Sequence, residues 1–132
     1  MTRGERNNNP CNIRISNAPW LGKANPSQDP AFEQFDEVQH GIRAAANLFL
    51  SYHKLYGLST VTQLISRWAP SNENDTDSYV ADVCSRMGVG AGDSLDLTDT
   101  SVLSSLVSAV IWHENGENPY STDEINAACA SA

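Results

Sequence analysis

Apolar residues recur every three or four positions along most of the chain beyond residue 37, a spacing typical of helices with one buried face. A first stripe runs from His40 to a stop at Gly57 and consists of Ile42, Ala45, Phe49, Tyr52 and Tyr56. A second stripe lies between a candidate N-cap at Ser59 and Pro70, and consists of Val61, Leu64, Ile65 and Trp68. The pattern therefore predicts a long helix followed by a short one.

Three further helices are predicted in the second half of the chain, because helical spacing again follows residues that favour helix N-termini. The N-terminal signals are Asn74 or Asp75, Asp99 or Thr100, and a capping box of Ser121 with Glu124. The apolar positions behind them are Tyr79, Val80, Val83 and Met87, then Leu103, Leu106, Val107, Val110 and Ile111, and finally Cys129. Gly88 supplies a C-terminal stop for the first of these helices.

The first 37 residues are rich in Asn, Pro, Gly and Ser and do not show this periodicity. Short extended stretches at Asn12–Ile15 and Phe32–Phe35 predict loops with a small β-hairpin, and no helix. We therefore expect a mainly α, single domain over residues 1–132, with an irregular segment at 1–37 and a helical body at 38–132.

The pattern singles out Glu114 as a candidate acid catalyst. It lies three residues after Ile111 and seven after Val107, so it extends the inward stripe of its helix, and the Asn115-Gly116 turn opens space in front of it. A glycosidase needs such a group, because a partly desolvated carboxylic acid keeps a proton available near neutral pH. The alternative is a Glu that points into solvent, although the helix dipole disfavours that position by a few tenths of a kcal/mol.

Composition argues against several classes of function. The net charge of −8 disfavours nucleic acids and anionic membranes as partners. No apolar run approaches the roughly 18 residues that span a bilayer, and the polar N-terminus is not typical of a secretory signal. Free thiols in a reducing compartment are expected from the wide spacing of Cys11, Cys84 and Cys129. No zinc motif is formed by His40, His53 and His113, and no cofactor is expected.

The charge is unevenly distributed. Residues 1–23 carry four cations against Glu5 alone, a local charge of +3, and these cations are Arg3, Arg6, Arg14 and Lys23. Such a cationic lip would suit an anionic polymer or another subunit, or it would form a solvated tail. Glu5 has only four residues before it, so it is predicted as a surface charge outside any helix.

Three short segments resemble lysozyme-like enzymes. Ile111–Ser121, with its Glu-Asn-Gly and Asn-Pro-Tyr-Ser, is similar to the catalytic helix end of soluble lytic transglycosylases and goose-type lysozymes. Residues 8–14 with Trp20-Leu21-Gly22 resemble the stretch after the catalytic Glu of flagellar-type glucosaminidases, and residues 74–80 resemble the stretch that supplies their active-site Tyr. The order is permuted here. This reflects either a circular permutation of a lysozyme-like fold or a chance match of Asn-rich strings.

Nearly the whole chain also resembles a group of small phage and prophage proteins. The shared pieces are Arg3–Arg14, Arg67–Pro70, Glu73–Tyr79 and His113–Gly116. This resemblance implies a virion-associated or lysis-related protein with other phage structural proteins as partners, present in the virion or in the host cytoplasm before assembly. The group has Gly where this chain has Cys11, so a loop that needed a positive φ at that position would be altered.

Together, the residues and the resemblances predict a protein that cleaves peptidoglycan between its amino sugars, as a muramidase or a lytic transglycosylase. Glu114 would be the general acid, Tyr79 would lie near the reacting sugar, and Glu73 would be a second carboxylate or simply a loop residue that caps a helix. Candidate sugar contacts are Asn8, Asn9, Asn12 and Trp20. The alternative is a non-catalytic tail or hub protein that retains a hydrolase-like fold.

Overall fold

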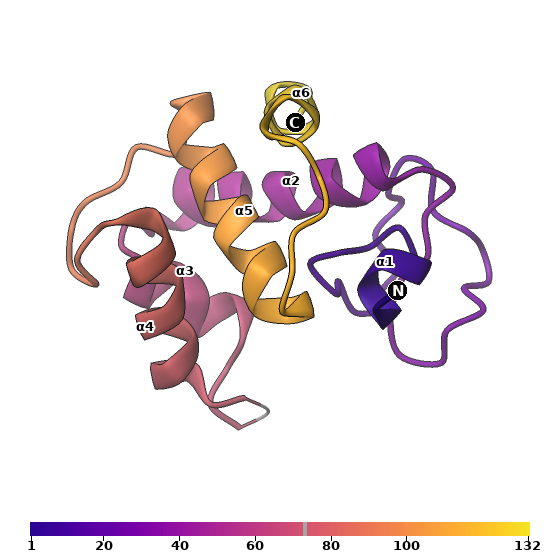
Figure 1. Cartoon of the computed structure of the whole chain (residues 1–132), viewed down its shortest axis with the longest axis horizontal. Coiled ribbons are helices and arrows are strands. Elements are labelled where there is room, and N and C mark those ends of the chain that lie inside the picture. The colour runs from indigo at the N-terminus through magenta and orange to yellow at the C-terminus, as the bar shows by residue number, and fades with distance from the viewer. Residues whose placement is uncertain (73) are drawn as a thin grey trace.

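The computed structural model describes residues 1–72 and 74–132, and the prediction of a mainly α fold is confirmed there. Six helices follow one another: α1 (Arg3–Arg6), α2 (Val38–Tyr56), α3 (Val61–Trp68), α4 (Thr76–Met87), α5 (Thr100–Asn115) and α6 (Thr122–Ala130). Helix α5 runs through the middle, with α2 and α6 packed against it, α3 and α4 to one side, and the N-terminal segment to the other (Figure 1).

The helix ends follow the residues that the sequence offers. Helices α2, α4 and α5 stop at glycines with a left-handed backbone, at Gly57, Gly88 and Gly116. The N-cap of α3 was predicted at Ser59, but it is Thr60. The Thr60 hydroxyl accepts the backbone N–H of Gln63 while the Gln63 side chain returns to the cap, so this capping box places the start one residue later.

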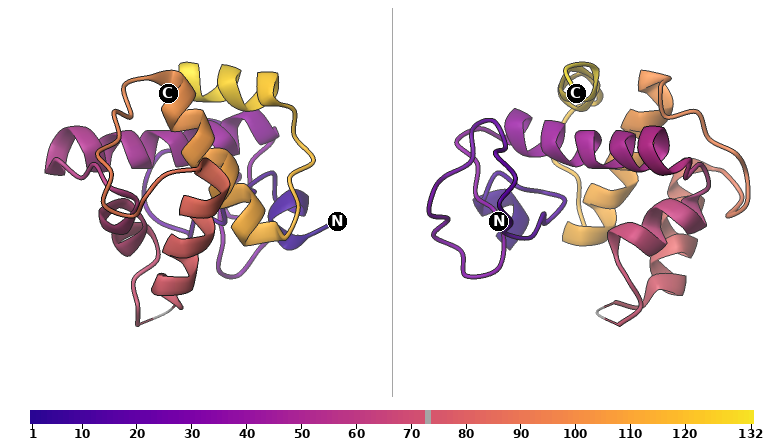
Figure 2. Two further views of the ribbon diagram at one scale, coloured as in Figure 1. Left: turned by 60° about the vertical axis from the view of Figure 1, so that its left-hand side comes forward. Right: turned by 180° about the vertical axis from the view of Figure 1, so that it is seen from behind.

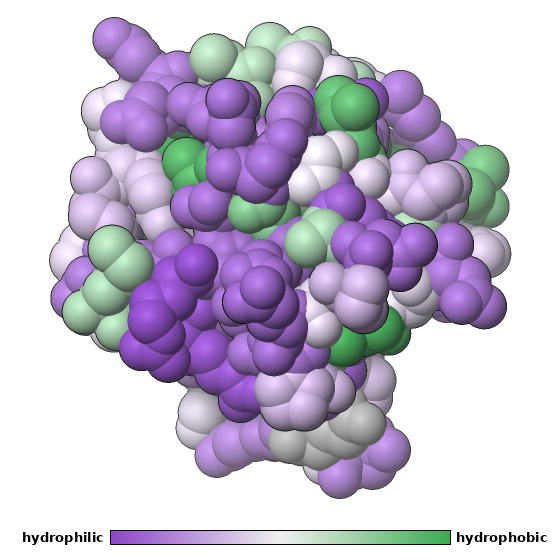
Figure 3. Space-filling model, turned by 90° about the vertical axis from the view of Figure 1, so that its right-hand side faces the viewer, coloured by the Kyte–Doolittle hydropathy of each residue, from purple (hydrophilic) through white to green (hydrophobic). Residues whose placement is uncertain are grey.

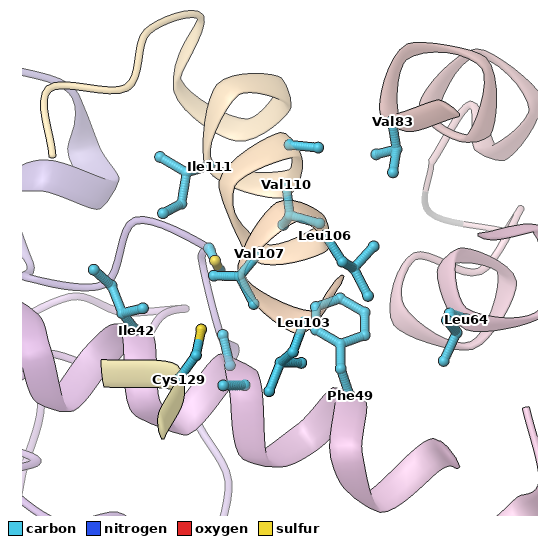
Figure 4. Packing of buried hydrophobic residues seen from close by; sticks show 14 of the residues in the cluster. Ile42, Phe49, Leu64, Val83, Leu103, Leu106, Val107, Val110, Ile111 and Cys129 are labelled. Carbon is cyan, nitrogen blue, oxygen red and sulfur yellow. The ribbon is translucent and has the colours of Figure 1, made fainter. Parts of the chain in front are cut away.

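The core gathers around α5, which buries the apolar stripe predicted for it. Figure 4 shows Leu103, Leu106 and Val107 of α5 facing Ile42 and Phe49 of α2, with residues of α3, α4 and α6 closing the cluster. Burying one such side chain stabilises the fold by roughly 1.5–3 kcal/mol. This packing makes the C-terminal end of α5 a rigid platform.

The segment before α2 contains a helix that the sequence was not expected to form. Helix α1 is one turn long, and it begins with a capping box in which the Thr2 hydroxyl accepts the Glu5 N–H and the Glu5 carboxylate accepts the Thr2 N–H. The interpretation of Glu5 as a residue outside any helix was therefore wrong, because the Thr-x-x-Glu signal begins at the second residue. The two extended stretches do pair, through an isolated antiparallel bridge between Arg14 and Phe32.

The rest of this segment is held by buried polar groups. Asn9 is fully buried and bonds to backbone atoms of Ile13 and Glu33, which joins the two extended stretches. Two cations of the cationic lip pair with acids of the same segment, Arg3 with Asp29 and Lys23 with the buried Glu33. Figure 2 shows the segment at one end of the molecule, beside the end of α5.

Figure 3 views the molecule from the side of the N-terminal segment. This face is mainly hydrophilic, with apolar side chains only in small scattered patches. It therefore offers small polar contacts rather than a broad apolar docking surface.

Within residues 1–72 and 74–132, none of the helices combines the length and the apolar character that crossing a bilayer requires.

Candidate active site

Glu114 lies in the last turn of α5, where three parts of the chain meet. The Tyr79 hydroxyl of α4 donates a hydrogen bond of 2.6 Å to Glu114 Oε2. The Asn12 amide of the N-terminal segment donates one of 2.8 Å to Glu114 Oε1. Each carboxylate oxygen therefore has its own protein donor, and the side chain is fixed in direction while half-buried.

Tyr79 is a buried donor. Its side chain is 2% exposed, and burial, reinforced by the neighbouring Glu114 carboxylate, raises the pKa of Tyr79 far above its ordinary value. The phenol therefore keeps its proton at any physiological pH, and its hydrogen bond to Glu114 has a fixed direction.

His113 and Asp82 support the Tyr79 ring. The His113 ring stacks on the Tyr79 ring, with their centroids 3.7 Å apart, and His113 Nδ1 lies 2.9 Å from a carboxylate oxygen of Asp82. Burial alone would raise the pKa of Asp82, but hydrogen bonds from His113 and Arg86 hold it below its usual value. Asp82 therefore stays ionised and orients His113 against the ring.

The N-terminal segment reaches Glu114 because its backbone and α5 are tied together. Asn12 adopts a left-handed conformation with φ of 55°, which Asn tolerates better than most residues. The Asn115 side-chain amide donates from Nδ2 to the Pro10 backbone carbonyl at 2.7 Å, and its Oδ1 accepts the Thr2 hydroxyl at 2.7 Å. Gly4 allows this approach, since a Cβ there would lie 2.8 Å from Asn115 Oδ1.

Two cavities open at Glu114. The first, of 370 Å³, lies between the N-terminal segment and the helical body, and its walls include Asn12, Arg14, Trp20, Tyr52, Trp68 and Glu114. The second, of 280 Å³, is lined by Asn74, Asp75, Ser78, Tyr79, His113 and Glu114. Glu114 is thus accessible from an aromatic cavity on one side and from a polar cavity on the other.

The predicted site residues divide into two groups. Tyr79 and Asn12 contact Glu114, and Trp20 lines the same cavity as Asn12. Asn9 is fully buried, is bonded to the backbone and lines neither cavity. Asn8 is bound to the carbonyls of Phe35 and Asp36 and lines neither cavity.

Two sequence expectations concern other positions in the site. Glu73, the candidate second carboxylate, lies outside the described residues. The position of Cys11 does not need glycine, because the left-handed backbone falls on Asn8 and Asn12 instead. Cys11 is 1% exposed and borders the aromatic cavity, where burial, with Glu114 as a further cause, raises the pKa of its thiol.

Sequence reasoning did not find the residues that support the site. His113 directly precedes Glu114 and so projects about 100° away from it on the helix, a direction that brings its ring onto Tyr79. Asp82 was not singled out, although it pairs with Arg86 four residues later on the same helix. Asn115 was read as a turn residue. Only long-range packing reveals these roles, since each partner is distant in sequence.

The comparisons with known proteins give the chain a family. No protein-family model matches it. Over 126 residues, however, it is 41% identical to "Protein P5" of Pseudoalteromonas phage PM2, and the alignment covers 93% of this chain and 77% of that protein. The chain belongs to the family of Protein P5. The P5 family is a family of phage proteins, as the resemblance of the whole chain implied, and the name specifies no activity.

Proposed function

We propose that this P5 family chain is a virion-associated glycosidase that cleaves the glycan strand of peptidoglycan, with Glu114 as the general acid. The observation that carries the proposal is the position of Glu114, fixed by two hydrogen bonds where two cavities meet. An acid catalyst must be held rigidly, yet it must reach a ligand, and this arrangement meets both conditions.

The two cavities fit a polymeric substrate better than a small molecule. A glycan that passed Glu114 would place one sugar in the aromatic cavity and the next in the polar cavity, with the bond between them at the carboxyl group. Trp20, Tyr52 and Trp68 offer aromatic surface to a sugar ring.

The proposed reaction uses Glu114 as the acid and the two hydrogen-bond donors Tyr79 and Asn12 to stabilise its carboxylate. Glu114 would transfer its proton to the glycosidic oxygen as the bond between that oxygen and the anomeric carbon breaks. The carboxylate left behind would be stabilised by the hydrogen bonds from Tyr79 and Asn12, which are already in place and need no reorganisation. No cofactor takes part in this step.

A structural role is the second candidate, and one observation favours it. The Glu114 carboxylate joins α5, α4 and the N-terminal segment through the same two hydrogen bonds. A tail or hub protein would use such a contact to hold its fold. In that case Glu114 would matter for stability alone, because a buried donor that loses its acceptor costs roughly 1–3 kcal/mol.

Clearing of purified cell walls by wild type and Glu114→Gln separates the two roles. Gln keeps the size of the side chain and one acceptor oxygen but has no proton to transfer, so we expect Glu114→Gln to remain folded and to lose clearing. Glu37→Gln is the matched control, because Glu37 is an exposed carboxylate that lines neither cavity. Thermal unfolding of all three proteins verifies that they are folded.

The outcomes are distinct. Equal clearing by wild type and Glu114→Gln would remove Glu114 from the mechanism. No clearing by wild type, together with a lowered melting temperature of Glu114→Gln, would favour the structural role.

A further inference from the structure

The polar cavity beside Glu114 contains a second carboxylate that sequence reasoning did not consider for catalysis. Asp75 lines this cavity together with Glu114, Tyr79 and His113. The cavity volume of 280 Å³ leaves room for a sugar and for water molecules at about 30 Å³ each. Among the described residues, Glu114 and Asp75 are the carboxylates that line it.

Two hydrogen bonds hold the Asp75 carboxylate in place and leave lone pairs on both of its oxygens free. Asp75 is the N-cap of α4, where one carboxylate oxygen accepts the Ser78 N–H at 3.1 Å and the other accepts the Ser78 hydroxyl at 2.9 Å. These two hydrogen bonds lower the pKa of Asp75, the backbone bond being the stronger cause, so the group is ionised at neutral pH. Each oxygen keeps a lone pair for another donor, and Asp75 is an exposed residue that lines the cavity.

We propose that Asp75 is the catalytic base that activates water for the glycosidase reaction, so that the protein hydrolyses its substrate with inversion at the anomeric carbon. This assignment rests on the proposed function of Glu114. A fixed acid and an ionised carboxylate in one cavity are the two groups that an inverting glycosidase requires.

The step balances as a hydrolysis. A water molecule in the polar cavity gives one proton to the Asp75 carboxylate while its oxygen bonds to the anomeric carbon. The bond from that carbon to the glycosidic oxygen breaks, and the leaving oxygen takes the proton of Glu114. The product carries a free reducing end, whereas a lytic transglycosylase would use the 6-hydroxyl of the sugar and leave an anhydro ring.

Two nearby acids serve as comparisons. Asp77 lies in the first turn of the same helix and is exposed, but it does not line the polar cavity. Asp77→Asn therefore removes the same charge from the same helix end without touching the cavity. Glu73→Gln tests the carboxylate that the sequence had suggested for this role.

The main variant is Asp75→Asn, because Asn is as good an N-cap as Asp and keeps the start of α4 intact. We expect it to slow the release of reducing ends from purified peptidoglycan by roughly 100-fold or more, which is the usual contribution of a general base. Asp77→Asn should retain the rate of wild type, and a loss of activity in Glu73→Gln would assign the base to Glu73 instead. Thermal unfolding should show all four proteins folded.

Chemical rescue separates a base from a structural cap. Asp75→Ser keeps a capping hydroxyl and leaves space for azide, an anion that attacks carbon without a base. We expect azide to restore bond cleavage in Asp75→Ser and to yield a glycosyl azide, detected by mass spectrometry. Glu114→Gln should gain nothing from azide, since it lacks the acid.

Failure of this assignment differs from failure of the proposed function. An inactive wild type would end both. An active wild type that needs Glu114 but tolerates Asp75→Asn, loses activity with Glu73→Gln instead, or releases anhydro ends would overturn the role of Asp75 alone.

Discussion

Glu114 receives its two hydrogen bonds from donors of different rigidity. Tyr79 is 2% exposed and is braced by the stacked His113 ring, while Asn12 is half-buried on a loop in a left-handed conformation. The Tyr79 hydroxyl is therefore the firmer of the two anchors. Its hydrogen bond of 2.6 Å to a carboxylate is short enough to be counted among the strong, charge-assisted bonds.

Removing only the hydroxyl tests this anchor. Tyr79→Phe keeps the ring that stacks on His113 but leaves Glu114 Oε2 without its donor, so we expect unfolding to become easier by roughly 1–3 kcal/mol. If Glu114 is the acid, cleavage should also slow by about tenfold or more, which corresponds to about 1.4 kcal/mol. Denaturant melts and cell-wall clearing measure the two effects.

The control for this variant is Tyr56→Phe, which removes the hydroxyl of a tyrosine that is 57% exposed. It should change neither stability nor clearing. A Tyr79→Phe protein as stable as Tyr56→Phe would show that the hydrogen bond to Glu114 contributes nothing to the fold.

Among the helices, α2 supports the site through a single glycine. Gly41 lies in the buried part of α2, where an alanine would normally stabilise a helix by about 1 kcal/mol. A Cβ at Gly41, however, would overlap the carbonyl oxygen of Asn8, which is backbone and cannot swing away. Crowding should therefore outweigh helix propensity at this position.

The stability of Gly41→Ala shows whether crowding or helix propensity dominates at this position. We expect it to destabilise the protein by roughly 1–3 kcal/mol and to displace the loop that carries Asn12, with a loss of cell-wall clearing. Gly92→Ala is the matched control, because a Cβ there meets no atom within 4 Å. If Gly41→Ala proved more stable than wild type, the close approach of Asn8 to α2 would be refuted.

The helices could be predicted because their signals are local. Apolar spacing and the stops at Gly57 and Gly88 lie within a few residues of the elements they define, so predicted helix starts differ from the observed ones by at most two residues. The N-cap of α3 is Thr60 instead of Ser59, and α2 begins at Val38 instead of His40. Glu114 could be singled out for the same reason. Its direct partners Tyr79 and Asn12 were also named from the sequence, but Asp82 was not, because its position beside His113 depends on how α4 packs against α5.

For the molecule as a whole, the distribution of acids controls how stability depends on pH. Several carboxyl groups have a pKa below the ordinary value of 3.8, namely Asp29, Asp36, Asp75, Asp82, Asp96 and Asp99. Their causes are local: a hydrogen bond from Arg3 lowers the pKa of Asp29 most, for example. In acid, the unfolded chain takes up protons at these positions before the folded chain does.

This difference sets the direction of acid unfolding. Stability from these groups is fully present above the unfolded pKa of about 4 and is lost as the pH falls toward the lower folded values. We expect the melting temperature to be steady above about pH 5 and to decrease steadily below pH 4. Asp29→Asn should flatten this decrease, and a melting curve series followed by circular dichroism measures it.

The pKa of Glu117 is shifted in the opposite direction, so this group affects stability at neutral rather than at acidic pH. A hydrogen bond with Glu5 and repulsion by its charge raise the pKa of Glu117 above its ordinary value of 4.5, so the folded chain holds that proton more tightly than the unfolded chain. As the pH rises through the folded pKa, the proton is lost and the two carboxylates repel each other. Glu117→Gln should therefore raise the melting temperature at pH 7 and have no effect well below pH 4.

The exposed Glu37 supplies the comparison, because Glu37→Gln lowers the net negative charge by the same amount. Glu37 is the N-cap of α2, where a negative charge is favoured by the helix dipole, so its removal should lower the melting temperature slightly at pH 7. If both variants gained stability equally, relief of the overall charge of −8 would explain the effect, and the repulsion between Glu5 and Glu117 would not.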